Sequence, residues 1–101
     1  MANLIPAEKQ AAVAAAASTD LLYLMDEAEL DTDSQYVLIC TNGYKTVRLV
    51  SGIEENRAGV RQCCVDVFRF DQQQPAGRLA TAKMITIWEA CKETLTQEAK
   101  S

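Results

Sequence analysis

The sequence predicts an all-α fold, a compact bundle of four or five short helices in a single domain spanning residues 1–101. Composition is the first observation: 49% of the residues are hydrophobic and 24% are charged, which is typical of a globular chain with one core. Apolar residues also recur at helical spacing in several segments, and capping residues separate those segments. We expect the chain ends, residues 1–5 and 98–101, to fray.

The first segment is rich in alanine. Pro6 opens a run of strong helix formers that ends at Ala17, and proline is tolerated in the first turn of a helix. The polar residues Ser18, Thr19 and Asp20 follow, so a helix over 6–17 either breaks and recaps or continues into 19–29. The apolar stripe of the second segment is formed by Leu21, Leu24, Met25 and Ala28.

The middle of the chain carries signals for short helices. Thr32 with Gln35 three residues later fits a capping box for a helix over 33–41, and Gly43 then supplies a left-handed cap. Thr46 is a candidate cap for a short helix over 46–51.

Two longer helices are predicted after this point. Ser51 with Glu54 repeats the capping-box spacing before a helix over 55–68. Its apolar stripe consists of Val60, Cys63, Cys64, Val67 and Phe68. Residues 71–77 form a polar loop that contains Pro75 and Gly77, and the last helix spans 78–97. Its stripe consists of Met84, Trp88, Cys91 and Leu95.

Residues 36–50 also allow a different structure. The segments on either side of Asn42-Gly43 are rich in β-branched and aromatic residues, and Asn-Gly fits a type I′ hairpin turn. This alternative is an α+β fold with a 36–50 hairpin. We favour helices because a lone two-stranded ribbon is marginally stable, and the rest of the chain offers no third strand.

The stretch Asn42-Gly43-Tyr44-Lys45-Thr46-Val47 resembles the turn between two short helices in helix-hairpin-helix and SAM-like domains, including the N-terminal domain of recombinases. This resemblance implies a bundle of four or five short helices, used for nucleic-acid backbone binding in some members and for protein contacts in others. The DNA-binding members carry Gly-apolar-Gly, whereas Ser51-Gly52-Ile53-Glu54 lacks the second glycine and brings Glu54 and Glu55 to the phosphate position.

A second resemblance covers residues 20–95. The stretches Gly43–Val47, Arg57–Arg61 and Trp88–Lys92 are similar to a helical module in predicted algal and mobile-element proteins. That module has no known activity, so the resemblance implies a fold and no function.

The charge of the chain disfavours nucleic acid and membranes as partners. The formal net charge is −4 and the chain has no histidine, so the general attraction of a basic surface for phosphate is missing. The best candidates for a local nucleic-acid contact are Lys45, Arg48, Arg57 and Arg61. Arg57 and Arg61 share one helix face at i, i+4 spacing.

We expect no enzyme activity, no metal site and no cofactor. Without histidine, a catalytic base would have to be Asp, Glu or Lys, and none is paired with a nucleophile by motif. The acidic cluster does not fit a calcium-binding loop, so we interpret it as a solvated helix end; its members are Asp26, Glu27, Glu29, Asp31 and Asp33.

The cysteines lack zinc-finger or redox spacing, which predicts buried free thiols in a reducing compartment. They stand at positions 40, 63, 64 and 91. The Ala11–Ala17 run is a poor signal peptide and too short to span a bilayer, so the default is a soluble, intracellular, cytoplasmic protein with no membrane contact.

These observations favour a non-catalytic interaction or assembly module that presents a helical surface to another protein or to its own copies. Trp88 is a candidate interface anchor, because tryptophan is enriched in binding hot spots. Its place in the Met84–Leu95 stripe favours a core position instead.

Overall fold

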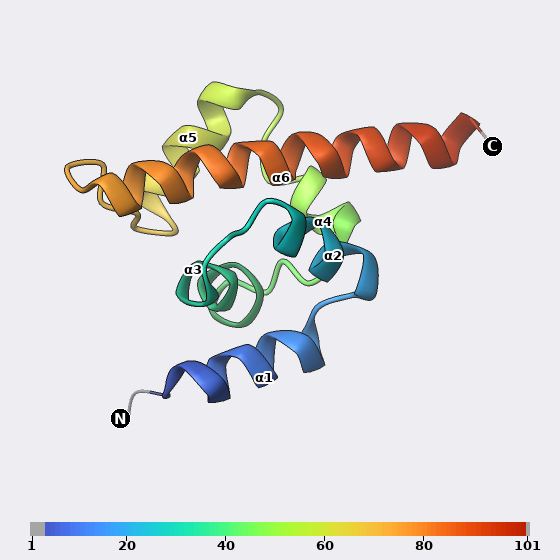
Figure 1. Ribbon diagram of the computed structural model, residues 1–101. Coiled ribbons are helices and arrows are strands. Elements are labelled where there is room, and N and C mark those ends of the chain that lie inside the picture. Colours follow the sequence, from blue (N-terminus) through green and yellow to red (C-terminus); the bar gives the residue numbers. More distant parts are fainter. Residues whose placement is uncertain (1–3, 101) are drawn as a thin grey trace.

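The computed structural model describes residues 4–100, and its longest element is the helix at the C-terminal end. This helix, α6, spans Pro75–Lys100, and its 26 residues extend about 39 Å. The whole molecule measures 45 Å along its longest axis. α6 runs across the molecule, and its C-terminal end projects beyond the other helices (Figure 1).

The other helices form two groups. α2 (Thr19–Glu27), α4 (Val47–Ser51) and α5 (Arg57–Asp66) pack on α6. α1 (Pro6–Ala16) packs instead on α3 (Thr32–Tyr36) and on the π-helix η1 (Val37–Thr41) that continues α3. No strand occurs in residues 4–100, so the all-α prediction is confirmed. Part of the expected fraying falls on residues 1–3 and 101, which lie outside the described residues.

Every helix except α3 contributes apolar side chains to one continuous core. The core side chains with the least exposure are Val13, Leu21, Met25, Leu38, Ile39, Val50, Val60, Cys64, Met84, Ile87 and Cys91. The predicted stripe of α6 supplies two of them, Met84 and Cys91, and adds Trp88, as its spacing predicts. α6 therefore carries the face on which α2, α4 and α5 are assembled.

The alternative hairpin over 36–50 is wrong. Leu38 and Ile39 are adjacent and both fully buried, whereas successive residues of a strand point to opposite faces of a ribbon. In a helix both can face the core, because α1 and α6 lie on different sides of this segment. Tertiary packing therefore overrides the local β preference.

Gly43 ends this helical segment in the left-handed region, with φ of +81°, as predicted. The closing hydrogen bonds run from the Asn42 N–H to the Val37 carbonyl and from the Tyr44 N–H to the Leu38 carbonyl, each 3.1 Å. Each of these two hydrogen bonds encloses one residue more than the corresponding bond at the end of an ordinary α-helix. The reason is that the last turn is a π turn. The predicted single helix over 33–41 is thus α3 followed by η1.

Helices α1 and α2 are separate, so the option of one continuous helix is wrong. Ala17 and Ser18 are extended, with ψ of 144° and 153°. The Ser18 N–H donates to the Lys45 carbonyl at 2.8 Å, a partner distant in sequence. This bond takes the place of the helical one and turns the chain toward the core.

Two predicted caps are wrong by a few residues, and one is confirmed. Asp31, not Thr32, caps α3, because its carboxylate accepts from the Ser34 N–H at 3.1 Å. Asn56, not Ser51, caps α5 by accepting from the Gly59 N–H at 2.8 Å. Thr46 caps α4 as predicted, accepting from the Leu49 N–H at 3.2 Å. Asp31 is a stronger cap than Thr32, whereas Asn56 equals Ser51 in strength and stands directly before the true start of α5 at Arg57.

The end of α2 is fastened to α6. Glu29 adopts a left-handed conformation with φ of +58°, and the Leu30 N–H closes the helix on the Met25 carbonyl at 3.1 Å. The Lys83 ammonium of α6 then donates to the Glu29 carbonyl at 2.7 Å. A cation is favourable here because helix C-termini carry partial negative charge. This contact helps to fix the position of α2 on α6.

Helix α6 begins at Pro75, three residues before the predicted start. Proline suits the first turn of a helix, so it opens α6 instead of closing the loop. Gly77 lies against the loop: a Cβ atom built there would overlap the backbone of Asp71. Thr81 and Gln72, joined by a 2.8 Å hydrogen bond, hold the same loop to the helix. Gly77 is therefore required for close approach and is not a helix breaker.

We predict that Gly77→Ala destabilises the domain by about 3 kcal/mol, because the added methyl group must displace backbone. Gly52→Ala is the matched control. A Cβ there meets carbonyl oxygens at 3.6 Å, an ordinary contact, so the change should stay within about 0.5 kcal/mol. Urea unfolding followed by circular dichroism measures both. Equal stabilities of the two variants would contradict the close approach of the loop.

Candidate functional site

The strongest candidate site is a groove between α2 and the C-terminal third of α6. Two adjoining hollows, of about 690 and 420 Å³, share the lining residues Leu24 and Thr94. We call their union the α2–α6 groove. Its other lining residues are Thr19, Asp20 and Tyr23 from α2, and Ala90, Glu93, Gln97 and Glu98 from α6.

Helical spacing places both walls of the groove. Asp20, Tyr23 and Leu24 lie at i, i+3 and i+4, and Leu24 borders the buried face that carries Leu21 and Met25. The α6 wall follows the same rule from Ala90 to Glu98. Ala90 and Thr94 are small, which leaves the space between the two helices open.

Tyr23 is the largest apolar group left to solvent at this site. Its side chain is 62% exposed, the highest value among the exposed large hydrophobic residues of 4–100. The sequence pattern does not single out Tyr23, because the stripe through Leu21 and Met25 is sufficient to explain how α2 packs on the core. A second apolar face on α2 is the signal that could have identified it.

The rim of the groove is acidic. Asp20 stands on one wall, Glu93 and Glu98 stand on the other, and no lysine or arginine lines either hollow. Within residues 4–100, neither Asp20 nor Glu93 has an ion-pair partner. The charge of Asp20 acts across the two helices: after burial, it is the second cause of the raised pKa of the Cys91 thiol on α6.

The four predicted basic residues lie outside this groove. Lys45 is exposed just before α4, Arg48 is exposed within α4, and Arg61 is exposed on α5. Arg57 is engaged: its Nε and Nη2 atoms lie 2.8 and 2.6 Å from Oε2 of Glu89 on α6. A nucleic-acid contact by these residues stays a prediction from the sequence.

Trp88 lies in the core and not on the surface. Its side chain is 4% exposed, and the Lys92 ammonium lies 4.8 Å from the ring centroid. In this conformation the ring is not available as an exposed interface anchor. Its place agrees with the apolar stripe of α6.

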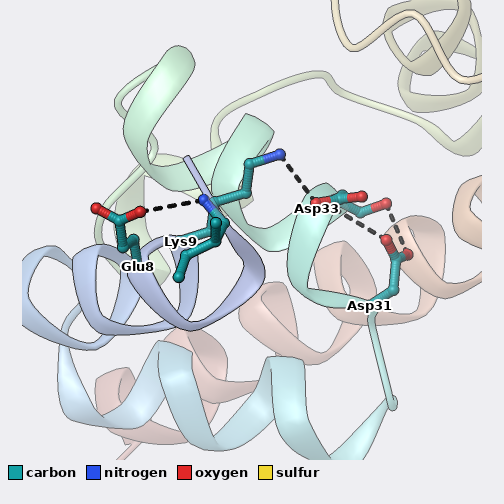
Figure 2. Close-up of polar contacts among 6 residues, drawn as sticks. Glu8, Lys9, Asp31 and Asp33 are labelled. Atoms are coloured by element: carbon teal, nitrogen blue, oxygen red, sulfur yellow. Dashed lines mark hydrogen bonds and ion pairs between the residues drawn. The ribbon is translucent and has the colours of Figure 1, made fainter. Parts of the chain in front are cut away.

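The acidic residues near α3 hold helices together (Figure 2). Asp33 forms a 3.0 Å ion pair with Lys9 of α1, and Asp31 accepts from the Ser34 hydroxyl at 2.7 Å. Lys9 also lies 5.6 Å from the centroid of the Tyr36 ring. Nowhere in the described part of the chain do three or more metal-ligating side chains gather.

The thiols are poor nucleophiles. All four cysteines are free, and Cys64 and Cys91 are fully buried. Burial raises the pKa of each of these two thiols to about 12. Burial, with the charges of Glu54 and Asp66, also raises the pKa of half-buried Cys63. Thiolate chemistry needs a lowered pKa, so these sites favour packing over reaction.

Comparison with protein-family models, curated proteins and solved structures found no match to this chain. Between residues 4 and 100, no helix combines the length and the apolar character needed to cross a membrane. The resemblance to SAM-like and helix-hairpin-helix domains stays a prediction from the sequence.

The buried thiols predict how stability depends on pH. At alkaline pH the unfolded chain loses thiol protons near pH 9.0, whereas Cys64 and Cys91 keep theirs in the fold up to about pH 12. Their contribution is therefore fully present below pH 9 and is lost as the pH rises toward 12, by about 1 kcal/mol per pH unit for each thiol.

Denaturant unfolding between pH 8 and pH 11 measures this slope. Cys91→Ala should make this slope shallower by the contribution of one thiol. Cys40→Ala, at a half-buried cysteine, is the comparison. An unchanged slope in Cys91→Ala would contradict burial of that thiol.

Proposed function

We propose that this domain is a non-catalytic protein-interaction module that receives a segment of another protein in the α2–α6 groove. The main support for this proposal is the exposed Tyr23, which lines the larger hollow of the groove, of about 690 Å³. Aromatic residues next to apolar pockets are frequent anchors in protein interfaces.

The core holds α2 and the first turn of the α6 wall in place, which supports this role. α2 is held to the core by Leu21 and Met25, and the adjoining turn of α6 is held by Trp88 and Cys91. Lys83 fastens the end of α2 to α6. A surface that is already ordered loses little conformational entropy when a partner binds.

The chemistry of the lining supports a binding role over a catalytic one. The Thr94 hydroxyl donates to the Ala90 carbonyl at 2.8 Å, so it is engaged within its own helix. The remaining polar groups of the lining are carboxylates, the Gln97 amide, and the hydroxyls of Thr19 and Tyr23. This set includes no base matched to a nucleophile near neutral pH.

A photo-crosslinking amino acid in place of Tyr23 tests the proposal in cells that contain the protein. We expect a discrete crosslinked product, and Thr94→Arg should abolish it because the longer side chain fills the groove. Thr86→Arg is the matched control, since Thr86 is exposed on the same helix and makes the same kind of bond, to the Ala82 carbonyl.

The same crosslinker in place of Leu79, an exposed residue at the other end of α6, reports nonspecific contact. The proposal fails if the Leu79 site gives the same product, or if Thr94→Arg leaves the Tyr23 product unchanged while its circular dichroism stays native. A product with twice the mass of the chain would show that a second copy occupies the groove.

A further inference from the structure

We infer that the α2–α6 groove binds an amphipathic helix whose apolar face is flanked by lysine or arginine. This inference rests on the proposed function and adds the chemistry of the partner. It follows from three features of the site: the charge of its rim, the nature of its walls, and its length.

The first feature is charge. Asp20 stands on the α2 wall and Glu93 on the α6 wall, neither with an ion-pair partner within residues 4–100, and the floor between them is formed by Leu24, Ala90 and Thr94. A ligand that buries apolar side chains on this floor brings its flanking residues against both rims. Cations on its flanks would be attracted there, and carboxylates would be repelled.

The second feature is that both walls are helices. Apart from the open first turn of α2 and last turn of α6, the backbone N–H and C=O groups of these walls are bonded within their helices, so the walls offer no strand edge to an extended peptide. A bound segment must then satisfy its own backbone hydrogen bonds where water is excluded. A helix does this, and its apolar residues at i, i+3 or i+4 match the spacing of the walls.

The third feature is length. The α6 wall runs from Ala90 to Glu98, about 12 Å along the helix, or roughly two turns. Such a wall accommodates two or three large apolar side chains of a partner helix. This contact is small, so we expect weak and reversible binding, with a dissociation constant on the order of micromolar.

A second copy of this chain does not suit the site. The chain has a net charge of −4, and its exposed α6 surface carries Glu93 and Glu98, so pairing of two such surfaces would set carboxylates against carboxylates. On α5, the basic helix face that the sequence singles out, Arg57 is engaged with Glu89. The occupant is therefore a basic helix of a different protein.

Three synthetic peptides of about 14 residues, roughly four helical turns, test this inference. The first carries leucines at i, i+3, i+4 and i+7 with flanking lysines. The second replaces the lysines with glutamates, and the third replaces the leucines with serines. Titration into the isotopically labelled protein, followed by NMR, reports both the affinity and the residues that respond.

We expect the lysine–leucine peptide to bind and to shift the amide signals of Tyr23, Leu24 and Thr94. Glu93→Lys should weaken this binding about tenfold, and added salt should weaken it further. Glu55→Lys is the matched control, because it makes the same charge change at an exposed residue outside the groove and should leave the affinity unchanged.

Two results overturn the basic partner but leave the interaction module intact. One is equal binding of the glutamate peptide at the same residues. The other is no groove shift with any peptide while the Tyr23 crosslink is still formed and is lost in Thr94→Arg. Equal binding of the serine peptide also overturns the inference, because it would show attraction by charge alone. Loss of both the peptide shifts and the crosslink contradicts the proposed function itself.

Discussion

The fold depends on the buried stripe of α6. Three helices that are far apart in the chain, α2, α4 and α5, pack on this one surface. A short isolated helix is marginal in water, and α4 has five residues, so its helical state depends on burying Val47 and Val50 in the shared core. The position of α2, and with it one wall of the groove, depends on α6 in the same way.

α6 has two parts with different roles. Its buried residues lie between Ala80 and Cys91, whereas residues 96–100 are exposed and project beyond the other helices (Figure 1). The groove lies where the first part gives way to the second. Tyr23 and Leu24 of α2 meet the small residues Ala90 and Thr94 there. The apolar stripe thus stabilises the domain along the middle of α6, and the groove that we propose as a binding surface lies beyond it.

The sequence predicts the helices well and the groove poorly. Periodicity locates the core of α6 at Met84, Trp88 and Cys91, and local rules identify the caps at Gly43 and Thr46. Helix starts are less certain, because neighbouring residues compete as caps, and because Pro75 opens a helix as readily as it breaks one. The groove brings together α2 and the end of α6, and no local pattern encodes that approach.

The core stabilises the middle of α6, and the part of this helix that we propose for binding lies beyond it. Native-state hydrogen exchange along α6 is the sharpest check of this division. Amides from Met84 to Cys91 should exchange only through global unfolding, whereas those from Thr96 to Lys100 should exchange orders of magnitude faster. Exchange of the Met84–Cys91 amides through a local opening, while α1 and α3 stay protected, would contradict it.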